Sequence, residues 1–224
     1  MKRIRIAALL VMGGLVSACG APNVGSQAAP FEATPLAFAD AQVETPEAAA
    51  PLTDVRVTDI KITVPRSLTV SEANRYLPKA DIVWRGDQIG DRHAQVAAIF
   101  DTAITRGAQM VNGTLPVSLD IKVTRFHALT EKARYSVGGV HNIDFELTLR
   151  DPETGAALAD TRFVRADLDG FGGQQAINAE ARGQTQKVRI TNHLAEVIRQ
   201  ELTTAEGFQN PRLGLIQAWN HQQK

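Results

Sequence analysis

The stretch VSLDIKVT at residues 117–124 decides the fold that we expect for this chain. Apolar residues alternate with polar or charged residues along its whole length. Successive side chains of a strand point to opposite faces, so this pattern predicts a strand, continuing through Phe126, with one buried and one solvated face. Such a strand is typical of a sheet that is covered on one side only.

A hairpin is predicted directly after this strand. A second strand begins near Val140, and its apolar residues alternate with polar ones over 143–149. The sequence DPETG at 151–155 is a strong turn signal, because proline presets φ and glycine supplies a positive φ. A return strand over 157–168 would then pair with the second strand in an antiparallel manner.

Shorter strand patterns come before residue 117. Apolar residues alternate over 55–64 in two runs that are offset by one residue, which predicts a strand with a bulge near Asp59. We expect a single helical turn over 71–74, before Pro78. A short strand over 80–84 should place Trp84 in the core.

Two helices are expected to cover the sheet. The first begins after Asp91 as N-cap, runs to Arg106 and ends at Gly107 in the C′ position. The second runs over 185–204. The residues that we assign to its buried face are Val188, Asn192, Leu194, Ala195, Val197, Ile198 and Leu202.

The segments around the second helix are expected to be less regular. Residues 169–184 contain four glycines and are interpreted as a polar loop. Beyond Gly207, a candidate C-cap, Asn210 and Pro211 could open a short amphipathic helix. Its apolar residues fall three apart, at Leu213, Ile216 and Trp219.

Together these elements predict an α+β fold in the order β-β-α-β-β-β-α. We expect a two-layer sandwich in which two helices cover one face of a mostly antiparallel or mixed sheet. The domain would span 52–206, and a tail would occupy 207–224. Lys plus Arg and Asp plus Glu number 24 each, so the charge gives no reason to expect binding to nucleic acid.

The start of the chain resembles a bacterial lipoprotein signal. Cationic residues precede an apolar run over 6–16, which is too short to cross a hydrocarbon core of about 30 Å as a helix. The lipobox, which the signal peptidase would recognise, ends at the single cysteine of the chain. It consists of Leu15, Val16, Ser17, Ala18 and Cys19.

The resemblance implies cleavage of a signal peptide over 1–18 and acylation of Cys19, for example by palmitate. The alternative is an uncleaved anchor with an incidental cysteine. Residues 19–51, punctuated by five prolines, would then be a flexible tether to a membrane, with the body facing the periplasm. Gly20, where an aspartate would suggest retention at the inner membrane, favours the outer membrane.

The body also resembles known envelope lipoproteins. Residues 76–84, 119–126 and 151–155 match the pattern of auxiliary lipoproteins of ABC-type envelope transport systems and of the amino-terminal domain of the curli-secretion lipoprotein. The resemblance covers about residues 52–206. Of functional residues it implies Cys19 alone.

The sequence contains no established catalytic or cofactor motif. No two of its five histidines have the spacing of metal ligands, although His127 and His141 could face each other across a hairpin. No phosphate-binding glycine motif occurs, and a single cysteine excludes a cysteine-based zinc cluster within one chain. We therefore predict neither a metal nor a cofactor.

Three groups of residues remain as candidates for function. Asp167 and Asp169 would lie on one face of a strand, where they could act in acid–base chemistry or simply serve the turn before Gly170. Phe171, with Gly172 and Gly173, could form a docking loop or an ordinary mobile loop. Trp219 could pack on its own domain or contact a partner.

Three hypotheses for the function follow. The first is a non-enzymatic, membrane-anchored lipoprotein that binds or scaffolds an envelope protein in transport or assembly. It would use the open face of the sheet and the loop over 169–184. The second is a carrier of a small ligand or lipid, and the third is an enzyme that uses Asp167 and Asp169.

Overall fold

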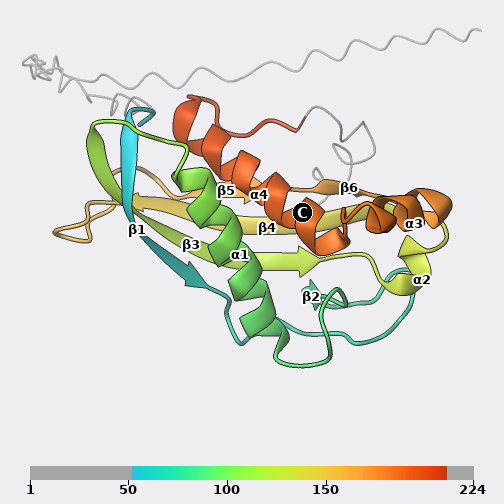
Figure 1. Ribbon diagram of the computed structural model, residues 1–224. Coiled ribbons are helices and arrows are strands. Elements are labelled where there is room, and N and C mark those ends of the chain that lie inside the picture. The colour runs from blue at the N-terminus through green and yellow to red at the C-terminus, as the bar shows by residue number, and fades with distance from the viewer. Residues whose placement is uncertain (1–51, 211–224) are drawn as a thin grey trace, which may run out of the picture. The chain divides into compact units, whose positions relative to one another are not determined.

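The computed structural model describes residues 52–210, which all belong to one compact unit. A mixed six-stranded sheet forms one layer, and helices form the other (Figure 1). The strands are β1 (Val55–Thr63), β2 (Ile82–Val83), β3 (Leu115–His127), β4 (Gly139–Arg150), β5 (Arg162–Arg165) and β6 (Leu168–Gly170). The helices are α1 (Arg92–Ala108), α2 (Glu131–Arg134), α3 (Gly173–Ala181) and α4 (Gln186–Thr203).

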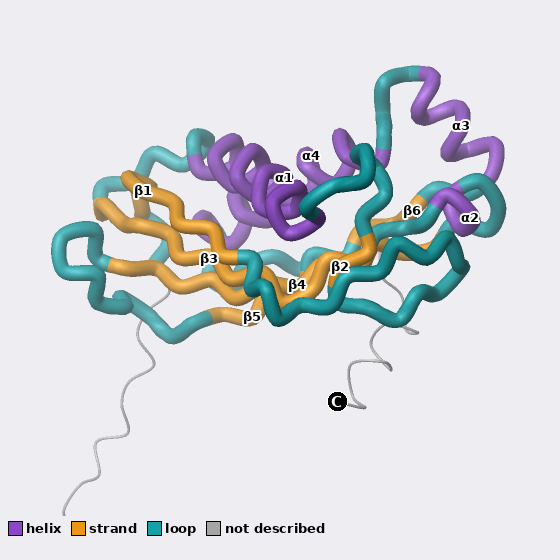
Figure 2. Tube along the Cα trace, turned by 90° about the horizontal axis from the view of Figure 1, so that it is seen from below, coloured by secondary structure: helices purple, strands orange, loops and turns teal. Residues whose placement is uncertain are grey.

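The sheet has the order β1-β3-β4-β5, with β2 beside the end of β3 and β6 beside the start of β4. β1 and β2 run parallel to β3, whereas β4 is antiparallel to β3, β5 and β6. Figure 2 shows α1 and α4 together on one side of the sheet. The predicted α+β class with helices on one face is therefore confirmed.

β3 shows the predicted alternation. Its residues at 117, 119, 121 and 123 are buried, and the side chains between them are at least partly exposed on the opposite face. On that open face, Lys122 Nζ lies 3.1 Å from Glu146 Oε2 and Arg150 Nε lies 3.0 Å from Asp120 Oδ2. This part of the open face is thus a solvated surface on which these four charged side chains are paired.

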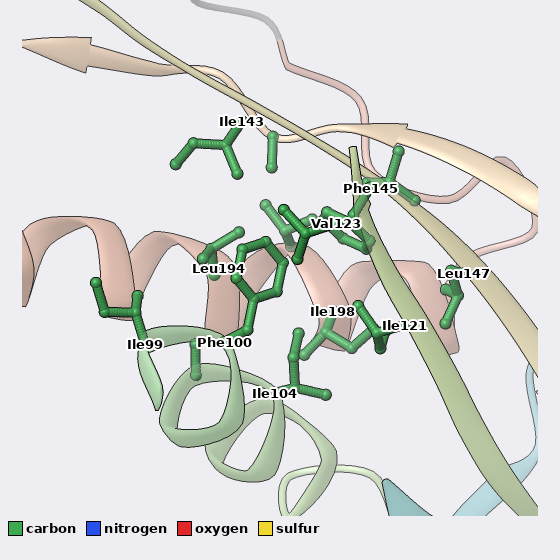
Figure 3. Close-up of a cluster of buried hydrophobic side chains, with 14 of the residues drawn as sticks. Ile99, Phe100, Ile104, Ile121, Val123, Ile143, Phe145, Leu147, Leu194 and Ile198 are labelled. Atoms are coloured by element: carbon green, nitrogen blue, oxygen red, sulfur yellow. The ribbon is translucent and has the colours of Figure 1, made fainter. Parts of the chain in front are cut away.

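The core lies between the sheet and the pair α1 and α4 (Figure 3). Phe100 of α1 makes edge-to-face contacts with Phe126 and Phe145, at 6.2 and 5.5 Å between ring centroids. Trp84 is fully buried against Phe126, as predicted, and its Nε1 donates to Asp87. Burial of each large apolar side chain contributes roughly 1.5–3 kcal/mol.

The prediction that α1 ends at Gly107 is wrong, because the helix continues to Ala108 with Gln109 as its C-cap. A Cβ atom at Gly107 would lie 2.0 Å from Ile198 Cγ2 and 2.4 Å from the carbonyl oxygen of Ala195. Glycine is needed here because α1 and α4 approach each other closely. Gly107, which the sequence suggests as the end of the helix, instead marks the point where α1 and α4 cross.

The buried face of α4 is only partly as predicted. Leu194, Ala195, Val197, Ile198 and Leu202 are buried, but Val188 and Asn192 are exposed. The helix instead buries residues that the pattern did not identify, namely Gln186, Ile190, Thr191 and Glu201.

The structure confirms the predicted bulge and turn but shortens the predicted return strand. The bulge in β1 lies between Val57 and Asp59, as predicted. The DPETG turn is also confirmed, since Asp151 Oδ1 accepts from two backbone N–H groups and Gly155 has φ +73°. The return strand is shorter than predicted: a bridge at Ala157 is followed by regular pairing only over β5.

Two predictions of irregular or helical structure are wrong. Residues 71–74 form no helical turn. Ser71 Oγ accepts from the backbone N of Ala73, and Arg85 Nη1 donates to the carbonyl of Glu72. Residues 169–184 are not a loop, because they contain the end of β6 and all of α3. Flanking glycines concealed α3, whose buried residues are only alanines.

The predictions for 1–51 and 211–224 lie outside the described residues. They include the signal, the tether and the C-terminal helix with Leu213, Ile216 and Trp219.

Candidate functional site: two hollows on opposite faces of β4

The first residues of β4 line two separate hollows. Val140 and Asn142 line a wide groove on the face of the sheet that is not covered by α1 and α4. His141, between them, lines a small cavity toward α3 and α4. Alternation along one strand therefore positions both sites.

The segment over 69–81 forms one wall of the groove and is held firmly in place. Asp81 Oδ2 accepts from the backbone N and the hydroxyl of Thr69, at 2.8 and 2.7 Å. His127 Nε2 lies 2.8 Å from the carbonyl oxygen of Pro78, and Thr130 Oγ1 donates to the carbonyl of Arg75 at 2.7 Å. The groove is therefore a preformed feature.

The groove combines apolar surface with positive charge. It has a volume of about 840 Å³. Leu77 on its wall is 84% exposed, and Tyr76 beside it is 48% exposed. Lys79 and Arg125 also line it, and Lys132 Nζ lies 4.8 Å above the Tyr76 ring. An exposed apolar surface with a charged rim is typical of an interaction site.

His127, which lines the groove, is held in its neutral form. Burial lowers the pKa of its imidazole, and the nearby Arg125 lowers it further. The positive charge of the groove therefore comes from Lys79 and Arg125, with Asp81 as the acidic residue that lines it.

The cavity on the other side of β4 contains several buried polar groups. His141 is 1% exposed, and its Nδ1 accepts from the backbone N of Leu129 at 3.2 Å. Burial, aided by the positive charges of Arg189 and Arg134, lowers the pKa of His141 to about 3. The ring is neutral at physiological pH, so its Nε2 carries the proton.

Two residues from different elements supply positive charge to this cavity. Arg134 Nη1 lies 3.0 Å from Glu180 Oε1 in an ion pair that does not have hydrogen-bond geometry. The Arg189 guanidinium stacks on Phe171 at 3.5 Å from the ring centroid and donates to the carbonyl of Asp169. Burial lowers the pKa of Arg189 from its ordinary value, and the charge of Asp169 opposes this effect.

Gln186, the first residue of α4, also lines the cavity. It is 4% exposed, yet neither atom of its side-chain amide has a hydrogen-bond partner among residues 52–210. Buried polar atoms are nearly always paired, because an unpaired group costs about 1–3 kcal/mol. This side chain is therefore expected to serve something other than packing.

The backbone around Gly138, which follows α2, lies in close contact with the backbone of residues 170–172, which precedes α3. A Cβ atom at Gly138, which has φ +74°, would lie 2.7 Å from the carbonyl oxygen of Gly170. A Cβ atom at Gly172 would lie 2.4 Å from the backbone N of Gly138. The glycines of 170–173 thus hold the segment after α2 against the segment before α3.

The structure separates several residues that the sequence had grouped. His127 and His141 do not face each other, because they lie on opposite faces of the hairpin. Asp167 is buried and accepts from the backbone N of Ile143, whereas Asp169 is exposed, so the two carboxylates do not form a pair on one face. Asp167 lies between β5 and β6, where the regular pairing with β4 is interrupted.

Of the residues predicted to contact a partner or carry a lipid, only Phe171, Gly172 and Gly173 lie in the described part of the chain. Phe171 is half-buried beneath Arg189, and Gly172 and Gly173 begin α3. Cys19 and Trp219 lie outside the described residues. Sequence reasoning missed the groove wall at Tyr76 and Leu77, although two adjacent apolar residues before a proline in a polar segment were a signal for it. It also missed Gln186, whose burial depends on tertiary contacts.

Neither a metal site nor a membrane span is found in the described part. No group of three or more His, Cys, Asp or Glu side chains within 52–210 could hold a metal ion. None of the helices between these residues has the length and apolar character that crossing a membrane requires.

A family model, described as a family of unknown function (DUF6778), matches residues 55–218. The chain belongs to this family. The match begins with the first residue of β1, so both hollows lie within the region that defines DUF6778. None of the curated proteins compared with this DUF6778 chain matches it.

Two solved structures are distantly similar. One is a protein from Caulobacter crescentus with a provisional description as a lipoprotein; identity is 12%, coverage is 68% of this chain and 90% of that chain, and the TM-score is 0.32. The other, from Xanthomonas campestris and assigned to family model DUF330, shows 15% identity, coverage of 68% and 87%, and a TM-score of 0.37.

Proposed function

We propose that this protein is a lipoprotein of the bacterial cell envelope that binds a protein partner and catalyses no reaction. The lipobox at 15–19 supports an anchor on Cys19, and Gly20 favours the outer membrane. A tether that confines the body near a membrane raises its effective concentration toward partners there. Transport or assembly in the envelope is the process that we propose it serves.

The groove is the observation that carries the proposal. Its wall presents Tyr76 and Leu77 to solvent, although exposing apolar surface of this size costs free energy that burial would recover. Hydrogen bonds hold this wall in place before a partner arrives. Binding therefore costs little conformational entropy of the wall.

The charge of the groove indicates the chemistry of its partner. Among the described residues, neither Lys79 nor Arg125 forms an ion pair within 4.0 Å. Asp81 accepts hydrogen bonds from Thr69, and the charge of Arg125 also lowers the pKa of Asp81. A segment of a partner protein with apolar residues flanked by Asp or Glu would complement this surface. We take such an acidic, apolar segment as the occupant.

The rest of the open face, around Lys122, Glu146 and Phe163, is a weaker candidate than the groove at its end. Its charges pair with one another across β3 and β4. Its large apolar side chain, Phe163, is 51% exposed and stands beneath the guanidinium of Arg165. Docking there would break existing ion pairs. An acidic segment in the groove would instead add carboxylates beside Lys79 and Arg125, which form no ion pair within 4.0 Å among the described residues.

A photocrosslinking amino acid at Leu77 tests the proposal in the full-length protein in membranes. We expect adducts with an envelope protein, mapped to a segment with apolar and acidic residues. Lys79→Glu together with Arg125→Glu should reduce the adducts about tenfold or more, since a charge-paired contact contributes 1.5–3 kcal/mol.

The matched control carries the same crosslinker at Phe163 on the open face. Adducts from Phe163 but not from Leu77, or adducts from Leu77 that are unchanged by the charge reversals, would contradict the proposed site.

A carrier of small ligands is a second candidate. The volume of the groove, about 840 Å³, lies within the range of ligand pockets, about 300–1,000 Å³. Lipid that copurifies with the wild type and is lost in Leu77→Asp would favour the carrier over the binding module.

The anchor has its own test. Cys19→Ala should abolish labelling by a fatty-acid probe and release the protein from membranes, because a lipid chain is the proposed source of membrane affinity. A mutant that still labels and still fractionates with membranes would refute the lipobox interpretation.

A further inference from the structure

The cavity beside His141 is small, and most of the polar groups that line it are hydrogen-bond donors. It has a volume of about 10 Å³, which is the space that one water-sized atom occupies. The side chains that line it come from α2, β4, α3 and α4 and from the segments before and after α3. They are Arg134, His141, Phe171, Ala176, Ala179, Glu180, Gln184, Gln186 and Arg189.

Donors outnumber acceptors in this cavity. The neutral His141 has its Nδ1 occupied by Leu129, so the group that it retains is the Nε2–H donor. Within residues 52–210, Arg134 Nε and both polar atoms of the Gln186 amide are buried without a hydrogen-bond partner. The acceptor Glu180 Oε1, whose charge is paired with Arg134, also has no hydrogen bond. Arg189 adds a guanidinium that has no carboxylate within 4.0 Å in residues 52–210.

The electrostatic environment is positive. Both guanidiniums lower the pKa of His141, which shows that they oppose a further positive charge at that position. Glu180 offsets Arg134 through their ion pair, and the charge of Asp169 acts on Arg189 from outside the lining of the cavity. The amino-terminal end of α4, where Gln186 lies, contributes the positive end of a helix dipole.

We propose that this cavity binds a carboxylate group, with one oxygen seated beside Gln186 and the other at the open mouth beside Arg189. The planar fork of a guanidinium matches a carboxylate, and the amide N–H of Gln186 would gain the acceptor that it lacks. A cation is disfavoured by the two arginines.

The geometry of Arg189 supports this assignment. Its stack on Phe171 and its bond to Asp169 fix the plane of the guanidinium at the edge of the cavity. A fixed, planar donor is preorganised for a carboxylate and loses little side-chain entropy on binding. Phe171, which we first considered as a partner anchor, instead positions this arginine.

This inference is independent of the groove. The two hollows lie on opposite faces of β4, so a variant in one leaves the residues of the other unchanged. Either proposal can therefore fail while the other stands.

The test is a titration of the protein with sodium acetate, against sodium chloride at equal ionic strength, followed by NMR. We expect saturable shifts of the Gln186 side-chain amide and the Arg189 Nε–H resonances with acetate and not with chloride. N-acetylalanine is the second probe, because its carboxylate mimics the end of a peptide chain. Its binding would identify a chain terminus as ligand, and binding of acetate alone would identify a free small acid.

Two variants and a control make the test specific. Arg189→Met, which retains the apolar stem over Phe171, and Gln186→Leu should each weaken acetate binding about tenfold or more. Arg182→Gln, which removes an exposed cation at the end of α3, should change it less than about twofold. Unsaturable shifts, equal shifts with chloride, or equal affinity in Arg189→Met and the wild type would overturn the proposal.

Discussion

The two ends of the helix-covered side of the sheet differ in the polarity of their buried side chains. Beneath α1 and α4 the contacts are made by side chains such as Phe100, Phe145 and Ile198, which carry no polar atoms. Beside α3 and the first turn of α4, the buried side chains include His141 and Gln186. The first end stabilises the fold, and the second retains polar groups whose burial costs stability.

In a chain without catalytic motifs, buried polar groups without partners indicate where a functional site lies. Unpaired buried polar groups are rare in proteins because each one lowers the free energy of unfolding. Where several of them gather around one cavity, a bound molecule that pairs with them is the simplest physical reason for keeping them. The predictions below test whether the two ends differ as this view requires.

The largest effect is expected at the apolar end. Phe100→Ala should lower the free energy of unfolding by about 3–5 kcal/mol, because it leaves a cavity between two other aromatic rings. Phe171→Ala, at the polar end, should cost markedly less, since Phe171 is only half-buried. Urea unfolding of both variants measures the difference, and equal losses would remove the contrast.

The next effect concerns pH and comes from the polar end. The pKa of His141 is about 3 in the folded state, below its ordinary value of 6.5. Between these values the unfolded state binds a proton that the folded state excludes, so stability is constant above pH 6.5 and falls as the pH is lowered. From pH 7 to pH 5 this group should cost about 2 kcal/mol.

His141→Asn isolates this contribution, because its side-chain oxygen can still accept from the backbone N of Leu129. Burial also lowers the pKa values of His127 and His193, so the variant should retain part of the pH dependence. Urea unfolding at pH 7 and pH 5 measures the effect. If wild type and His141→Asn lose the same free energy, His141 does not make the proposed contribution.

A smaller effect is expected on the open face. A double-mutant cycle on Lys122→Met and Glu146→Gln should give a coupling energy of about 0.2–1 kcal/mol, because water screens this exposed pair. A coupling well above this range would show that paired charges on the open face matter as much as the buried polar groups.

The sequence predicts the apolar end far better than the polar end. Alternation in residues 117–124 and 143–149 follows directly from strand geometry, so the sheet and its covered face are predictable. The cavity is not, because it needs residues from four elements to meet, and α3 shows too weak a pattern to be recognised. Gly107 shows a further limit: a single glycine fits both a helix stop and a helix crossing.

The groove was also beyond prediction, for a different reason. Tyr76 and Leu77 stand out in the sequence only as apolar residues in a polar segment. Their exposure results from hydrogen bonds that Thr130 and Asp81 make over long distances along the chain. No local pattern encodes those contacts.

The unfolding free energy of Gln186→Leu, measured by urea denaturation without carboxylate ligands, tests the central contrast most directly. Our account predicts a value equal to or up to about 1 kcal/mol above that of the wild type, because an apolar side chain replaces an amide that has no partner within the described residues. A loss of about 2 kcal/mol or more would contradict it, since Gln186 would then stabilise the fold as the apolar core does.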